Sequence, residues 1–161
     1  MSAQGNEWNG LREPEPTLPS AYYLGADHHQ LELRKIWYRN WIYLCRAEAL
    51  AEPRSFATFT VGTQSILVVR DDAGALHAFH NTCRHRGAEL CAAKAGRLPA
   101  AAITCRYHAF SYGLDGKFLR RPTYGRAPVA VDQDLSLYAL QLREWNGFVF
   151  VNLDPAPAPE P

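Results

Sequence analysis

Two short segments of the chain combine cysteine with histidine at close spacing. The first reads Cys83-Arg84-His85-Arg86-Gly87, and the second reads Cys105-Arg106-Tyr107-His108. Cysteine thiolates and histidine imidazoles are common protein ligands of zinc and iron. Because each segment offers one ligand of each kind, the two together could supply two thiolates and two imidazoles to a metal centre.

The mixed pairing favours an iron–sulfur cluster over zinc. Structural zinc sites usually pair cysteine with cysteine and histidine with histidine, as C-x2–4-C and H-x3–5-H. A [2Fe–2S] cluster needs four terminal ligands, and two thiolates on one iron with two imidazoles on the other is the Rieske arrangement. The spacing therefore predicts Cys83, His85, Cys105 and His108 as cluster ligands, with Gly87 allowing a sharp turn after the first histidine. The alternatives are a Cys2His2 zinc site and a chance grouping of buried cysteines.

The composition limits what can surround this centre. The chain has 161 residues, of which 47% are hydrophobic and 20% charged, and this suits one globular domain. The net charge of +1 and the lack of a basic run argue against nucleic acid as a partner. No apolar stretch is long enough for a bilayer, and the start lacks the features of a signal peptide. We therefore expect a cytoplasmic protein with no membrane partner, in which Cys45 and Cys91 are free, buried thiols.

Apolar residues alternate with polar ones along most of the chain, which predicts an antiparallel β-fold with many hairpins. Asn146-Gly147 is the strongest of the turn signals between strands. Helix is expected only near the start, over 26–38, with Asp27 as its N-cap. The expected strands cover 41–45, 56–62, 64–70, 75–81, 102–105, 109–112, 117–120, 136–144 and 148–153.

The predicted elements divide the chain into three parts. Residues 1–19 form an N-terminal arm, and residues 20–153 form the domain, with a small cluster-binding subdomain at about 81–115. Residues 154–161 (DPAPAPEP) hold four prolines in eight positions, which is typical of a linker or tail. Such a linker leads us to expect that a further domain normally follows.

Beyond the ligands, the sequence resembles a known family. AFHNTCRHRGAELC followed by CRYHAFSYGLDGKF is similar to the N-terminal Rieske [2Fe–2S] domain of the α (large) subunit of aromatic-ring-hydroxylating oxygenases. Segments 22–50 and 148–155 are also similar, so the resemblance covers about residues 20–155. It implies an all-β, Rieske-type antiparallel β-sandwich with a small cluster-binding subdomain and a short N-terminal helix. It also implies that Cys83 and Cys105 bind one iron and that His85 and His108 bind the other.

The resemblance further implies one-electron transfer. A ferredoxin or flavin reductase would donate the electron, and a mononuclear non-haem iron, in a catalytic domain or subunit, would accept it. Such dioxygenases and monooxygenases hydroxylate aromatic substrates. The resemblance also suggests that the protein forms a homo-oligomer. No second iron site is evident, so we expect a redox relay with no catalytic residues of its own, acting as part of an enzyme. The alternatives are an independent Rieske-type ferredoxin and a zinc-stabilised interaction module.

Two aromatic residues follow the second ligand pair. Tyr112 resembles a tyrosine of high-potential Rieske proteins, which implies that its hydroxyl points at the Cys83 sulfur. Phe110 replaces a serine that in those proteins donates to a bridging sulfide, and Ala109-Phe110 replaces the Gly-Trp usual in the oxygenases. Since one donor to sulfur is kept and one is lost, we expect a potential near the low end of the Rieske range, about −150 mV.

Three arginines, Arg84, Arg86 and Arg106, stand beside the ligands. They are either ordinary surface charges or a basic collar that guides an acidic electron donor.

Overall fold

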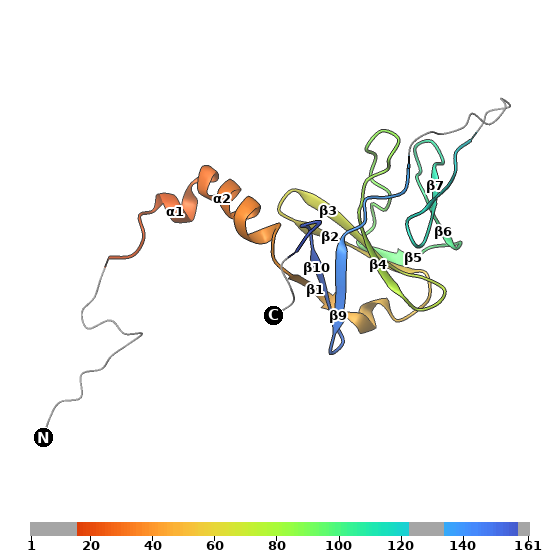
Figure 1. Cartoon of the computed structure of the whole chain (residues 1–161), viewed down its shortest axis with the longest axis horizontal. Coiled ribbons are helices and arrows are strands. Elements are labelled where there is room, and N and C mark those ends of the chain that lie inside the picture. Colours follow the sequence, from red (N-terminus) through yellow and green to blue (C-terminus); the bar gives the residue numbers. More distant parts are fainter. Residues whose placement is uncertain (1–15, 123–133, 158–161) are drawn as a thin grey trace, which may run out of the picture.

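The computed structural model describes residues 16–122 and 134–157. Within these ranges, three antiparallel sheets form the body of the protein, and a helical arm projects from it (Figure 1). The mainly antiparallel β architecture agrees with the fold class expected from the sequence. None of the helices in the described ranges is long and apolar enough to cross a membrane.

The arm differs from the single helix predicted over 26–38. It consists of α1 (Ala21–Leu24), α2 (Ala26–Glu32) and a π-helical turn at Leu33–Trp37. The prediction that Asp27 is the N-cap is wrong, because Gly25 holds that position and Asp27 lies in the first turn. The Gly25 N–H donates to the Ala21 carbonyl at the end of α1. The Gly25 carbonyl accepts from the His29 N–H at the start of α2. A Cβ at Gly25 would collide with the Ala21 carbonyl, so the junction needs glycine.

Two sheets face each other across one of the two hydrophobic cores. The first has the order β1-β10-β9, formed by Ile42–Arg46, Phe148–Asn152 and Gln141–Trp145. A 3-10 turn at Ala47–Leu50 follows β1. The second has the order β4-β3-β2-β5, formed by Leu76–His80, Gln64–Arg70, Ser55–Val61 and Ala95–Arg97.

Strand β3 connects this core to the one beneath the ligand loops. Ile66 and Val68 pack with Val151 in the core between the two sheets. Leu67 and Val69 point to the opposite face and belong to the core that contains Cys83 and Cys105. A strand that is buried on both faces reads as a continuous apolar run, as ILVV does here.

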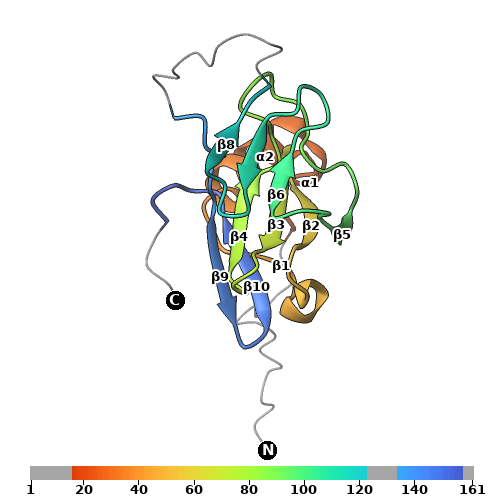
Figure 2. The same cartoon turned by 90° about the vertical axis from the view of Figure 1, so that its right-hand side faces the viewer.

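The third sheet carries one of the ligand loops. It consists of β6 (Ala102–Thr104), β7 (Ser111–Gly113) and β8 (Phe118–Arg120) in sequential order. It therefore extends past residue 115, the expected limit of the cluster-binding subdomain. In both Figure 1 and Figure 2, the loop after β4 and the loop between β6 and β7 lie side by side at the top of the molecule.

Two segments depart from the predicted strands. Residues 136–144 were expected as one strand, yet only Gln141–Trp145 is regular, and Ala139 makes a single bridge to Phe79. The cause is that residues 134–140 bond to several different elements in turn, including Gly116 and Ala78. Strand β5, Ala95–Arg97, was missed because its three exposed residues carry no alternating apolar pattern.

Candidate metal centre

The first ligand loop closes on Cys83. The Cys83 N–H donates to the Ala88 carbonyl at 2.8 Å, and the Cys83 carbonyl accepts from the Gly87 N–H at 3.0 Å. Gly87 has φ 72°, the left-handed conformation that glycine adopts without a steric penalty. This turn exposes His85 while Cys83 stays inside.

The second ligand loop repeats the same pattern of hydrogen bonds. The Cys105 N–H donates to the Phe110 carbonyl at 2.9 Å, and the Cys105 carbonyl accepts from the Ala109 N–H at 3.0 Å. Ala109 has φ 54°, so an alanine here adopts the conformation that Gly87 has in the first loop. This left-handed conformation also explains why β7 begins at Ser111, whereas the sequence predicted a strand that begins at residue 109.

The loops bring the two predicted thiol ligands into one core and the two predicted imidazole ligands next to each other. Cys83 and Cys105 are each only 2% exposed, and both belong to the same core. The ring centroids of His85 and His108 lie 4.8 Å apart, with the ring planes at 74°. His85 is exposed and His108 is half-buried. The thiols therefore form the inner side of the site and the imidazoles form its outer edge.

One ring nitrogen in this site has no partner. His108 Nδ1 is buried and is one of three buried side-chain polar atoms without a hydrogen bond in the described ranges. A buried polar atom of this kind is costly unless it binds something. A metal ion at His108 Nδ1 would satisfy it.

The donor arrangement fits a binuclear cluster. A [2Fe–2S] cluster takes two protein ligands at each iron. The two loops supply two buried thiols and two neighbouring imidazoles, which match this requirement.

Tyr112 links the core to the first loop. It is fully buried, and its hydroxyl lies 3.2 Å from Cys83 Sγ. The same hydroxyl accepts a hydrogen bond from the Arg84 backbone N–H at 3.1 Å. Burial, and then the hydrogen bond to Cys83, raises the pKa of Tyr112 well above its usual range. The phenol therefore stays protonated and can donate to a Cys83 thiolate.

An aromatic ring lies against each of the two imidazoles. Phe110 stacks on His85 with centroids 4.5 Å apart and planes at 3°, and Tyr107 lies over His108 at 3.8 Å. The pKa of His85 is lowered, first by desolvation and then by His108 and Arg86, which favours the neutral form that binds metal.

The remaining candidates make contacts outside the ligand loops. His77 Nε2 lies 2.8 Å from Asp71, and His80 meets the ring of Tyr138 edge-on. Cys45 and Cys91 are free thiols, half-buried on β1 and buried after the first ligand loop, respectively.

Two residues hold the first loop: sequence reasoning missed Asn81 and did not predict the structural role of Arg84. Asn81 is 1% exposed, and its side chain bonds both the N–H and the carbonyl of Cys91. Arg84 belongs to no basic collar, because its guanidinium bonds the carbonyls of Asp134 and Ser136. Both residues act through partners that are distant in sequence, and no local pattern marks such pairs.

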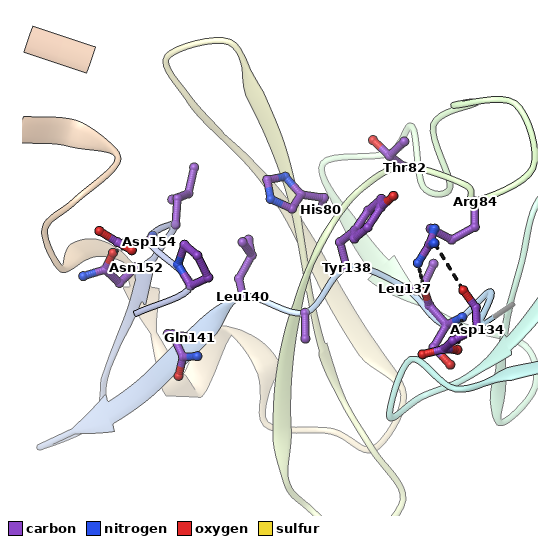
Figure 3. Close-up of a pocket in the computed structure, with 14 residues that line it drawn as sticks. His80, Thr82, Arg84, Asp134, Leu137, Tyr138, Leu140, Gln141, Asn152 and Asp154 are labelled. Atoms are coloured by element: carbon purple, nitrogen blue, oxygen red, sulfur yellow. Dashed lines mark hydrogen bonds between the residues drawn. The ribbon is translucent and has the colours of Figure 1, made fainter. Parts of the chain in front are cut away.

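Arg84 also lines a groove of about 610 Å³, which Figure 3 shows running from Arg84 past Tyr138 and His80 to Asp154. This groove does not include any of the four predicted ligands among its lining residues.

The chain is similar to known proteins. The profile of the Rieske [2Fe–2S] domain family matches residues 40–140. The glycine betaine monooxygenase oxygenase subunit of Chromohalobacter salexigens is 33% identical over 149 residues, which are 91% of this chain and 32% of that protein. The chain therefore spans about a third of the length of the curated relatives it matches.

Solved structures also align with most of this chain and with only part of their own. The quaternary ammonium Rieske monooxygenase CntA aligns with a TM-score of 0.80 and 30% identity, over 88% of this chain and 39% of that one. A naphthalene 1,2-dioxygenase aligns with a TM-score of 0.73 and 29% identity, over 84% of this chain and 31% of that one. One quaternary ammonium Rieske monooxygenase structure is described as giving insight into inter-subunit electron transfer.

Proposed function

The chain belongs to the Rieske [2Fe–2S] domain family, and we propose that it is the electron-relay portion of an oxygenase, with Cys83, His85, Cys105 and His108 as the cluster ligands. The observation that carries the ligand assignment is the buried, unpartnered His108 Nδ1 on the loop that also holds the buried Cys105. When bound, a Rieske cluster takes up and releases one electron at a time.

The side chains of the site have different roles. Cys83 and Cys105 lie buried at the inner side, and the Tyr112 hydroxyl donates a hydrogen bond to the Cys83 sulfur. His85 and His108 form the outer edge, where a redox partner can come closest. We propose a ferredoxin or flavin reductase as donor and a mononuclear non-haem iron as acceptor.

The helical arm favours a larger assembly over a free ferredoxin. Six large apolar side chains on the arm are 44–86% exposed: Tyr22, Tyr23, Leu24, Leu31, Ile36 and Trp37. A free carrier would leave this surface in water, whereas a catalytic domain or a neighbouring subunit would cover it. Inter-subunit electron transfer in a related monooxygenase supports a homo-oligomer.

The relatives favour one substrate class. Glycine betaine monooxygenase and CntA are named for quaternary ammonium substrates, and we propose a substrate of that class. Aromatic ring hydroxylation by a dioxygenase, the activity expected from the sequence, remains a second candidate because naphthalene 1,2-dioxygenase shares the fold.

We also propose domain limits of about 20–153, with the two ligand loops and β6–β8 as the cluster-binding subdomain. We propose a reducing compartment, the cytoplasm, which suits the free thiols Cys45 and Cys91.

Metal analysis tests the cluster, and rapid kinetics tests the relay. The purified chain should be red-brown and contain iron and acid-labile sulfide in equal amounts, about two of each per chain. Stopped-flow absorbance should show reduction of the chain by a ferredoxin and reductase pair. A colourless chain with stoichiometric zinc would support the interaction module instead. An iron–sulfur chain that no such donor reduces would contradict the proposed relay.

A further inference from the structure

Arg84 reaches away from the ligand loop that contains it. Its guanidinium donates to the Ser136 carbonyl at 2.5 Å and to the Asp134 carbonyl at 3.2 Å. The guanidinium carbon also lies 4.0 Å from the centroid of the Tyr138 ring. Figure 3 shows Arg84 beside Tyr138, with dashed lines marking the two hydrogen bonds. These three contacts, here called the Arg84 anchor, attach the first ligand loop to residues 134–138.

The backbone of the same residue acts on Cys83 through Tyr112. The Arg84 N–H can only donate, so the Tyr112 hydroxyl accepts that hydrogen bond at 3.1 Å. The hydroxyl has a single proton, and its other neighbour is Cys83 Sγ at 3.2 Å. A thiolate can only accept, so the hydroxyl proton must point at the sulfur.

Tyr112 and the loop differ in how firmly they are held. Tyr112 is fully buried in the core, whereas His85, Arg86 and Gly87 are exposed. The loop is therefore the side of this contact that can move. An external attachment that fixes the loop also fixes the position of the Arg84 N–H against the phenol.

We propose that Arg84 is a positioning residue of the cluster, because its anchor on residues 134–138 keeps the Tyr112 proton directed at the Cys83 sulfur. The proposal rests on the proposed cluster site. A hydrogen bond to a ligand sulfur stabilises the reduced state, so loss of the anchor lowers the reduction potential.

The chemistry of the anchor requires arginine. A planar guanidinium can donate to two carbonyls and lie flat on an aromatic ring at once, and a lysine ammonium cannot. Arg84→Lys therefore keeps the positive charge but loses the anchor. The Arg84→Lys variant therefore distinguishes two explanations: that the anchor positions Tyr112, or that the positive charge of residue 84 alone sets the reduction potential.

The test is voltammetry on the full chain carrying its cluster, with the EPR spectrum as a check of cluster integrity. Arg84→Lys and Arg84→Ala should both lower the potential, each changing the redox equilibrium constant about threefold, or about 28 mV for one electron. Arg97→Lys, the matched control on β5 outside the ligand loops, should leave the potential unchanged. Tyr112→Phe should lower the potential, and adding Arg84→Lys to Tyr112→Phe should cause no further change.

Two results would overturn the proposal. One is a normal potential in Arg84→Lys together with a lowered potential in Arg84→Ala, which would assign the effect to charge. The other is an additive effect of Arg84→Lys in the Tyr112→Phe background, which would remove Tyr112 as the intermediary. If the wild-type chain has no Rieske EPR signal, the proposed function fails; if it has the signal but Arg84→Lys leaves the potential unchanged, only the positioning role fails.

Discussion

Gly87 and Ala109 hold the same position in the two ligand loops. Each lies four residues after a cysteine, donates its N–H to the carbonyl of that cysteine at 3.0 Å, and has a positive φ, 72° and 54° respectively. The left-handed conformation costs an L-residue with a Cβ roughly 1–2 kcal/mol, and glycine avoids this cost. The second loop therefore carries backbone strain that the first does not.

Ala109→Gly should relieve that strain. We expect the free energy of unfolding to rise by about 0.5–1 kcal/mol, because the greater freedom of glycine in the unfolded chain offsets part of the gain. Denaturant unfolding of the chain with its cluster measures this change. A loss of stability in Ala109→Gly would contradict this expectation. It would show that contacts of the alanine methyl group stabilise the fold by more than the backbone strain destabilises it.

Gly87→Ala should have the opposite effect, at a cost of about 1 kcal/mol. No atom lies within 4 Å of a Cβ built at Gly87, so the cost is conformational only. Gly74→Ala is the matched control, since Gly74 also has a positive φ, 89°, and open space around its Cβ, but lies in the turn before β4. Both variants should unfold at a lower denaturant concentration than the wild-type chain. Only Gly87→Ala should also change the EPR spectrum of the cluster. An unchanged stability in both would contradict the strain argument.

Asn81→Ala should loosen the base of the first ligand loop. The substitution leaves the buried N–H and carbonyl of Cys91 without their partners, which costs about 1–3 kcal/mol. Asn40→Ala is the control, because Asn40 is exposed and its amide makes one bond, to the Ile36 carbonyl at 2.7 Å. Equal unfolding free energies for the two variants would show that Asn81 does not support the loop.

The reduction potential should lie near the low end of the Rieske range, about −150 mV. Phe110→Ser should raise it by adding a donor near the cluster, whereas Phe110→Leu adds none. The comparison matters because Phe110 packs flat on His85, so any small residue also opens the site. Voltammetry that finds the same potential in both variants would show that solvent access, and not the missing hydroxyl, sets the value.

Cys91 should alkylate slowly near neutral pH. Burial raises the pKa of this thiol to about 11; Arg106 opposes the shift and Glu89 adds to it. Since only the thiolate reacts, the rate of labelling by iodoacetamide should rise about tenfold per pH unit from pH 8 to pH 10. The buried neutral thiol also contributes stability that is lost as the pH rises from its ordinary value of 9.0 to about 11. Mass spectrometry of the Cys91 peptide gives the rate, and labelling at pH 8 as fast as in the denatured chain would refute the shift.

The parts of the protein that follow local rules could be predicted from the sequence. The hairpin at Asn146-Gly147 forms as expected, with both residues at positive φ. The apolar run of β3 gives a strand because every residue from Ile66 to Val69 is buried. The loops around Cys83 and Cys105 were expected to meet, and the short distance between the rings of His85 and His108 shows that they do.

What escaped prediction depends on contacts between distant segments. The Arg84 anchor joins residues 50 and 52 positions apart, and no spacing rule links them. The segment before β9 looks like a strand in composition, but its backbone groups bond to different elements in turn. Asp27 has the side chain of an N-cap, yet the junction of two helices requires the glycine at position 25.

The measurement that tests the ligand assignment most directly is pulsed EPR of the reduced chain, which detects imidazole nitrogens bound to iron. We predict a Rieske signal with two coordinated imidazole nitrogens in the wild-type chain. Cys83→Ser and His108→Ala should abolish the signal together with the visible absorption, and His77→Ala and His80→Ala should leave both intact. A normal Rieske signal in Cys83→Ser, or coupling to two imidazole nitrogens that persists in His108→Ala, would contradict the assignment.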